Sequence, residues 1–174
     1  MARLFVAVWP PADVVKALKA MVRPDLPNLR WMGPQQWHLT LRFMGRVDDV
    51  DAAIAAFERI DAPATTATFG PKIGRFGDRV LHVAVEGLEE LAAAVARATA
   101  DIGEPPDPRP FRGHLTLART RSRQRVDLRR LTGTIESVEW PVSSLTLVSS
   151  TTLPGGAVYE VLRRRELYSP GERP

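Results

Sequence analysis

The alternation of apolar and polar positions divides the chain into short strands and three helices. Segment 3–9, RLFVAVW, is almost wholly apolar and ends at two prolines, which is typical of a buried strand. Apolar residues recur at helical spacing over 13–22, 48–60 and 88–100, so these segments are predicted helices. Further strands are predicted at 36–44, 67–72, 79–85, 143–150 and 157–164, and the last two form a hairpin around LPGG.

The order of these elements indicates an α+β fold with mainly antiparallel strands. A proline-rich connection, GEPPDPRPFRG, leads from the third helix to one more strand that begins near residue 113. No linker long enough to separate domains interrupts the 174 residues. We therefore expect a single domain spanning 1–174, or one domain built from two similar halves, with a core that needs no disulfide or structural metal.

Two of the predicted strands contain the same tetrapeptide, HLTL. It occurs at 38–41 and again 76 residues later at 114–117. Because side chains alternate along a strand, His38 and Thr40 share one face and the leucines share the other, and His114 and Thr116 repeat this arrangement. Two of the chain's three histidines open these repeats. A duplicated architecture that brings the polar faces together would line one pocket with two imidazoles and two hydroxyls.

This pair of motifs suits acid–base catalysis at a phosphate. The pKa of an imidazole is about 6.5, so near neutral pH one ring can accept a proton while the other donates one. Threonine hydroxyls can hold phosphate oxygens, and arginines can offset phosphate charge. Such a site can cleave or close a phosphodiester without a metal. The third histidine, His82, has no neighbouring threonine and stands among apolar residues, so we interpret it as structural.

Composition removes several other kinds of site. The chain has no cysteine, which excludes disulfides, cysteine–zinc sites and thiol nucleophiles. Two histidines without a carboxylate at a ligand spacing make a metal site unexpected. No apolar run approaches the roughly 18 residues of a membrane span, and we expect a cytoplasmic monomer with no membrane contact.

Positive charge is concentrated in one segment. The net charge is +4, and eight arginines lie between Arg109 and Arg130, at positions 109, 112, 119, 121, 123, 125, 129 and 130. A charged, solvated loop is the common explanation of such a run. Its place directly after the second HLTL also suits a surface for phosphate or nucleic acid, because guanidinium groups match phosphate oxygens.

The two HLTL motifs and their surroundings resemble the 2H phosphoesterase superfamily, named for its two histidine motifs. The best match within it is the bacterial and archaeal RNA 2′,3′-cyclic phosphodiesterases, also described as 2′,5′ RNA ligases. Four segments resemble that family in the same order: RLFVAVWPP, WHLTLRFMG, RPFRGHLTLAR and LVSSTTLPGGAVYEVL. The resemblance implies a bilobal, pseudo-twofold α+β fold with helices flanking mainly antiparallel sheets around a central cleft. It also implies that RNA ends with a 2′,3′-cyclic phosphate are opened to a 2′-phosphate without metal or cofactor.

Carried over onto this chain, the resemblance assigns roles to the four motif residues. His38 is expected to be the general acid toward the departing 3′ oxygen. His114 is then the base that activates water. Thr40 and Thr116 are expected to hold the phosphate.

Two further residues stand five positions after the histidines. The resemblance implies that Phe43 and Arg119 sandwich the terminal base by aromatic and guanidinium stacking. Strict alternation instead predicts that both point to the face opposite the histidines, and core packing is then the competing interpretation for Phe43. Gly113 stands where relatives commonly carry proline, and a glycine there is expected to loosen the backbone before His114.

Other functions stay open on the sequence alone. A non-catalytic RNA-binding domain would use the arginine-rich segment and would tolerate loss of the histidines. A metallohydrolase would be inactivated by a chelator. Among 2H enzymes, 2′,5′-linked oligonucleotides or small cyclic nucleotides are alternative substrates. The reverse reaction would join RNA ends through a 2′,5′ linkage.

Overall fold

The computed structural model describes residues 2–121, 126–153, 156–169 and 171, and it shows a mainly antiparallel sheet with helices against it. The α-helices of this part of the chain are α1 (Ala12–Ala20), α2 (Val50–Glu58) and α3 (Glu89–Ala98), with short 3₁₀ turns η1 (Pro34–Gln36) and η2 (Leu128–Leu131). The strands are β1 (Ala2–Val8), β2 (Leu29–Trp31), β3 (Leu39–Val47), β4 (Thr65–Phe76), β5 (Val80–Glu86), β6 (His114–Thr120), β7 (Gly133–Thr134), β8 (Val138–Val142), β9 (Ser144–Leu153) and β10 (Gly156–Glu166). The predicted α+β class with mainly antiparallel strands is confirmed.

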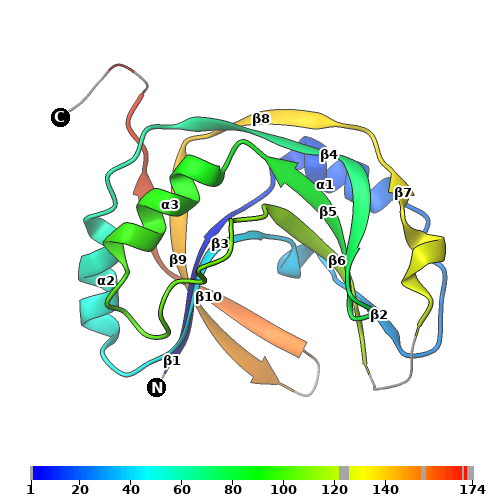
Figure 1. Ribbon diagram of the computed structural model, residues 1–174, viewed down its shortest axis with the longest axis horizontal. Helices are drawn as coiled ribbons and strands as arrows, with labels where there is room; N and C mark the ends of the chain where they lie inside the picture. Colours follow the sequence, from blue (N-terminus) through cyan, green and yellow to red (C-terminus); the bar gives the residue numbers. More distant parts are fainter. Residues whose placement is uncertain (1, 122–125, 154–155, 170, 172–174) are drawn as a thin grey trace.

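The sheet consists of two halves that join at its centre. Its strands follow the order β10-β9-β1-β3-β6-β5-β4-β7, with β2 paired to β6 and β8 paired to β4. The β3 and β6 strands pair only at Leu39 and Leu115. Beyond this junction the strands around β3 and those around β6 spread apart (Figure 1). The first half therefore comprises β1, β3, β9 and β10, and the second comprises β4, β5, β6 and the short strands beside them.

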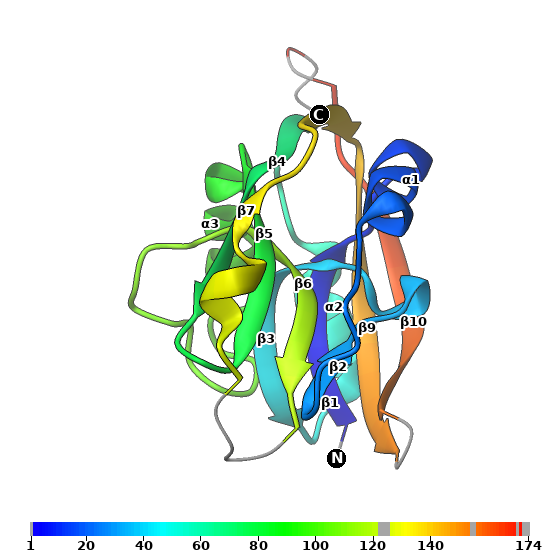
Figure 2. The ribbon, with the colours of Figure 1, turned by 90° about the vertical axis from the view of Figure 1, so that its right-hand side faces the viewer.

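The helices tie the two halves into one core. Although α3 follows β5 of the second half, it packs against β3 of the first half. Conversely, α1 follows β1 of the first half, but it lines a shared pocket with Ile73 of β4 and Leu131 of η2. Figure 2 shows α1 and α3 on different sides of the molecule. One continuous cluster of buried apolar side chains runs from Leu4 and Leu39 to Val83 and Leu115, so the halves share a core.

Most predicted elements are present, and the differences concern short or irregular segments. The sequence gives no signal for β8, which pairs only with β4 and contains Pro141; an edge strand tolerates proline because its outer side needs no N–H donor. The β4 strand runs to Phe76, beyond the predicted end at residue 72. Two members of the arginine run, Arg123 and Arg125, lie outside the described residues. None of the helices in the described ranges is long and apolar enough to cross a membrane.

Candidate active site

The two HLTL motifs meet at the junction of the halves. Leu39 and Leu115 are Cα partners in the antiparallel β3–β6 pairing, and both side chains are fully buried. In antiparallel pairing the residues flanking such a pair lie across from each other in reverse order. His38 therefore lies opposite Thr116, and Thr40 lies opposite His114. The structure brings the two imidazoles and two hydroxyls onto one face of the sheet, as the repeat predicts.

Each imidazole is held by the same hydrogen bond. The Nδ1 atom of His38 lies 2.9 Å from the carbonyl oxygen of Gln36, and Nδ1 of His114 lies 2.9 Å from that of Arg112. A carbonyl oxygen only accepts, so Nδ1 carries the hydrogen and donates in both rings. Nε2 of each neutral ring then carries the lone pair. Both histidines thus have one tautomer and the same nitrogen available for proton transfer.

The threonine hydroxyls stand beside these rings. Thr40 and Thr116 are both partly exposed. Within the described ranges neither hydroxyl has a protein hydrogen-bond partner. A hydroxyl can donate one hydrogen bond and accept others, so both are able to donate to an oxyanion held between the rings.

A β-bulge falls on the last residue of each motif and changes which way the following residues point. In β3, Thr40 pairs with Ala7 of β1 but Arg42 pairs with Val6, so Leu41 is the extra residue. In β6, Thr116 pairs with His82 of β5 but Ala118 pairs with Leu81, so Leu117 is extra. An extra residue shifts the alternation of side chains by one. The bulges therefore occupy the same position in both motifs.

This shift corrects the prediction that strict alternation makes for Phe43 and Arg119. Phe43 pairs with Phe5, which shares a face of β1 with Ala7, the partner of Thr40. Phe43 therefore lies on the face of the histidines and is 40% exposed rather than part of the core. Arg119 is exposed and returns to the same face of β6. The β3 strand continues past Phe43 to Val47.

Arg42 anchors the irregular part of β3 from behind. The bulge turns this side chain to the far face, where it is only 6% exposed. Its guanidinium donates to the backbone carbonyl oxygens of Phe43, Ile102 and Glu104. A buried charge needs such partners to offset its lost hydration. Arg42 thus ties the strand segment that carries Phe43 to the loop after α3.

Aromatic side chains that the sequence analysis did not assign enclose His38. Its ring centroid lies 4.9 Å from those of Phe5 and Tyr159 and 5.8 Å from that of Trp9. The indole Nε1 of Trp9 donates to Thr146 Oγ1 at 2.9 Å, which fixes its orientation. The only sequence signal was the presence of these residues in the apolar segments that open and close the chain.

His114 has different neighbours, and one of them is the third histidine. Its ring centroid lies 4.8 Å from that of Phe76 and 5.5 Å from that of His82. The His82 ring stacks on Phe76 at 4.0 Å. His82 is the cross-strand partner of Thr116, so its ring lies on the site face and not among the apolar residues next to it in sequence. This placement could not be predicted from the sequence, because it depends on the pairing of β5 with β6.

Burial lowers the pKa of all three histidines in the free protein. It lowers the pKa of His38 from 6.5 to about 4, helped by the positive charges of Arg119 and His114 and opposed by the bond to Gln36. Burial also lowers the pKa of His114; the hydrogen bond to the Arg112 carbonyl opposes this effect, and the charge of Arg119 adds to it. The pKa of His82 falls to about 4 through burial and the proximity of His114. An anion in the site would reverse the charge effects and raise these pKa values.

A steric constraint explains why a glycine occupies position 113. A Cβ atom at this position would collide with the backbone carbonyl of Val85. The same close approach allows the amide of Val85 to donate to the carbonyl oxygen of Gly113 at 2.9 Å. The backbone before His114 is therefore pinned to β5, contrary to the loosening expected from a glycine alone.

Among the residues that the structure describes, no group of three or more histidine and carboxylate side chains is arranged to hold a metal ion. The site face offers the two motif imidazoles with His82 beside them, two hydroxyls and a guanidinium. This set can transfer protons and bind an anion.

Known proteins resemble this chain in sequence over nearly its whole length. The model of the 2′-5′ RNA ligase superfamily matches residues 5–152. A protein of Thermus thermophilus named RNA 2′,3′-cyclic phosphodiesterase is 31% identical, with 99% of this chain and 98% of the relative covered. A protein of the same name from Aquifex aeolicus is 32% identical, with 82% of each chain covered.

Solved structures resemble it in fold. TT0787 of Thermus thermophilus aligns with a TM-score of 0.77 and 29% identity, covering 96% of this chain and 98% of that one. E. coli LigT complexed with 3′-AMP aligns with a TM-score of 0.75 and 25% identity, covering 95% and 98%. The fold and the paired histidine motifs are those of a 2H phosphoesterase. More narrowly, the chain belongs to the 2′-5′ RNA ligase superfamily.

Proposed function

We propose that this protein is an RNA 2′,3′-cyclic phosphodiesterase that opens terminal 2′,3′-cyclic phosphates to 2′-phosphates. The observation that carries the proposal is the meeting of His38 and His114 on one face, each with Nε2 available and each opposite the other motif's threonine. The names of the relatives from Thermus thermophilus and Aquifex aeolicus support this substrate class.

The reaction needs one base and one acid on opposite sides of the phosphorus. His114 accepts a proton from water through Nε2 as the water oxygen bonds to phosphorus. The bond between phosphorus and the 3′ oxygen breaks, and protonated His38 gives that oxygen its proton. The product keeps phosphate on the 2′ oxygen. Thr40 and Thr116 donate to the non-bridging oxygens and hold the phosphorus between the rings.

Binding of the substrate increases the fraction of His38 that is protonated. In the free protein burial and Arg119 keep the pKa of His38 well below neutrality. The negative charge of a bound cyclic phosphate raises that pKa, because it stabilises the imidazolium. The site is therefore ready for proton transfer only when an anion occupies it. Arg119, which acts on both histidines, also stabilises charge on the phosphate in the transition state.

Phe43 and Arg119 hold the terminal base in this proposal. The two bulges place both residues on the site face, one from each half. An exposed phenylalanine ring and a guanidinium group offer two planar surfaces for a base. Because the acid and base also come from different halves, residues 1–174 act as one catalytic domain. The monomeric state and the cytoplasmic location remain predictions from the sequence.

The proposal is tested with a short RNA that ends in a 2′,3′-cyclic phosphate, incubated with excess chelator. Wild type is expected to produce a 2′-phosphate. His38→Ala and His114→Ala are each expected to lose about 10³-fold in rate, while His82→Ala keeps most of the activity. RNA binding without turnover by wild type would favour the non-catalytic RNA-binding function. Turnover of only 2′,5′-linked or mononucleotide substrates would favour another 2H phosphodiesterase.

A further inference from the structure

Arginines gather on the site face beyond the residues that hold the terminal nucleotide. Arg3 of β1 is the cross-strand partner of Arg46 on one side and of Ser150 on the other. Ser150 in turn pairs with Tyr159 of β10. Cross-strand partners share a face of the sheet. Since Arg3 lies on the same face of β1 as Phe5, this row of side chains extends the site.

The second half of the sheet contributes a further guanidinium group near this row of side chains. Arg30 of β2 is the cross-strand partner of Arg119. Its guanidinium lies where a side chain on Gly156 would otherwise sit, so β2 approaches the β9–β10 hairpin of the first half. Gln36 bridges the same gap by donating to the carbonyl oxygen of Ala157 at 3.1 Å. Arg3 and Arg30 therefore approach Tyr159 from different halves.

Tyr159 contacts His38 and is close enough to these arginines to feel their charges. Its ring meets that of His38 edge-on at 4.9 Å. Burial raises the pKa of Tyr159, and the charges of Arg119, Arg30 and Arg3 partly oppose that rise. The phenol therefore stays protonated at neutral pH and can donate a hydrogen bond to an anion.

Arg3 lacks the acidic partner that several other arginines have. Arg75, Arg109 and Arg163 form ion pairs with Asp78, Asp107 and Glu58. No ion pair is found for Arg3 in the described part of the chain; its guanidinium lies over the ring of Phe43, 5.4 Å from the centroid. Arginine that is not neutralised by the protein, beside a tyrosine donor and an aromatic ring, suits a phosphate.

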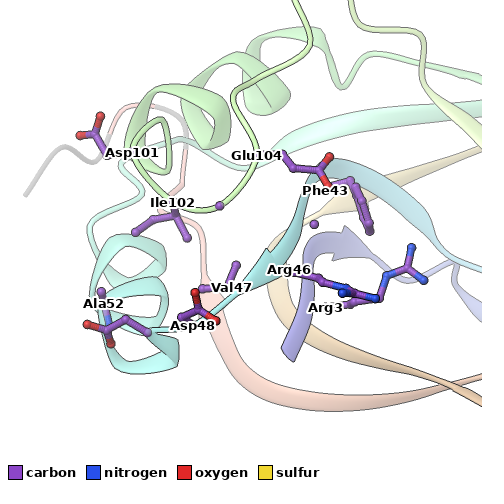
Figure 3. A pocket seen from close by; sticks show the side chains of 12 residues that line it. Arg3, Phe43, Arg46, Val47, Asp48, Ala52, Asp101, Ile102 and Glu104 are labelled. Atoms are coloured by element: carbon purple, nitrogen blue, oxygen red, sulfur yellow. The ribbon is translucent and has the colours of Figure 1, made fainter. Parts of the chain in front are cut away.

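The pocket next to Arg3 carries charges of both signs. A pocket of about 840 Å³ extends from Phe43, with Arg3 and Arg46 at one end. Figure 3 shows Asp48 and Asp101 away from these arginines, and Glu104 beside Phe43. The carboxylates of Asp48 and Asp101 would repel a polyanion that extended along the pocket. Arg3 and Arg46 therefore make their end of the pocket the more favourable one for a phosphate.

We propose that Arg3, Arg30 and Tyr159 form a second phosphate subsite that binds the phosphodiester immediately 5′ of the terminal nucleotide. This inference rests on the proposed function, and it defines the substrate class more narrowly. The protein acts on polynucleotide ends in preference to cyclic mononucleotides. The subsite binds the substrate, and the two histidines carry out the reaction.

The test compares three substrates that share the same reacting end. They are a 2′,3′-cyclic mononucleotide, a dinucleotide with a 2′,3′-cyclic phosphate end, and the same dinucleotide with an uncharged methylphosphonate linkage. Wild type is expected to prefer the charged dinucleotide over the other two by about tenfold in kcat/KM, because only it offers a charged phosphate to the arginines. Arg3→Ala is expected to remove most of this preference, and Tyr159→Phe part of it.

Arg163→Ala is the matched control. This arginine lies on β10, but its cross-strand partner Leu147 belongs to the buried core, so it is on the other face. Its loss should leave the preference unchanged. Thermal midpoints equal to that of wild type would show that the variants fold.

The outcomes separate the subsite from the proposed function. The subsite is overturned if wild type treats the charged and uncharged dinucleotides alike, or if Arg3→Ala slows all three substrates equally. Failure of wild type to hydrolyse any of them contradicts the proposed function instead. In that case the affinities of wild type and Arg3→Ala for the two dinucleotides decide on the subsite, and equal affinities reject it.

Discussion

The two halves of the sheet hold their histidines in the same way but surround them differently. In both halves Nδ1 donates to a carbonyl oxygen two residues earlier, at 2.9 Å. Around His38, however, stand the rings of Phe5, Trp9 and Tyr159, whereas His114 has Phe76 and a second imidazole. The repeated motif thus sets the tautomer and direction of each ring. The neighbouring strands set how readily each ring takes up a proton.

This difference bears on the roles of the two histidines. Burial and nearby positive charge lower the pKa of His38 to about 4 in the free protein. A general acid with that pKa carries its proton at neutral pH only after an anion has bound. The assignment of His38 as acid therefore requires that phosphate binding and protonation are coupled.

The largest expected effect comes from removing either of the two motif histidines. His38→Ala and His114→Ala each remove one partner of a single proton-transfer step, so each should lower kcat/KM by about 10³-fold. Because they act as a unit, the double variant should be little slower than either single variant. Initial rates on the cyclic-ended RNA measure this. Multiplicative losses would mean that the histidines act independently.

A change of leaving group separates the two histidines. If the 3′ oxygen of the cyclic phosphate is replaced by sulfur, the departing thiolate needs no proton. The rate of His38→Ala should then recover by about 10²-fold or more relative to wild type, whereas His114→Ala should stay slow. Single-turnover rates on the two substrates provide the comparison. Recovery of His114→Ala instead would exchange the two roles.

Removal of Arg119 should move the pH profile of kcat/KM, whereas removal of Phe43 should not. Removing Arg119 takes a positive charge away from both histidines. Their pKa values rise, so the pH profile of kcat/KM for Arg119→Ala should move to higher pH. Phe43→Ala should weaken binding by about 1–3 kcal/mol, the range for loss of one stacked base, without moving the profile. An unmoved profile in Arg119→Ala would place its charge away from the histidines.

The smallest expected effect is the contribution of His82 to the pH dependence of the free energy of unfolding. Its folded-state pKa of about 4 lies below the ordinary 6.5, so protons bind the unfolded chain preferentially between these values. The free energy of unfolding should fall as pH drops from about 6.5 to about 4. His82→Leu should reduce that fall by about 1 kcal/mol, since the ring is partly exposed to solvent. Urea unfolding at both ends of this pH range measures the difference, and an unchanged slope would contradict it.

Those features of the site that local patterns specify could be predicted from the sequence. Alternation within each HLTL placed histidine and threonine on one face, and the repeat itself indicated that the two faces meet. The bulges at Leu41 and Leu117 were invisible, because a bulge is a property of two paired strands and both segments read as unbroken alternation. The consequence was a wrong face for Phe43 and Arg119.

Contacts between distant strands account for the other omissions. His82 stands among apolar residues in sequence, and only the pairing of β5 with β6 sets it opposite Thr116. Trp9 and Tyr159 reach His38 from the two ends of the chain. Composition and periodicity carry no information on such neighbours, because they depend on the order and register of strands.

The central claim is that His38 and His114 bind one phosphate together. Imidazole nitrogen NMR of the protein labelled at its three histidines, titrated with a nucleoside 2′-monophosphate, tests it most directly. Both rings should move toward the protonated form with the same midpoint, while His82 changes much less, because an anion between the rings raises both pKa values. A response of only one ring, or two different midpoints, would contradict a shared site.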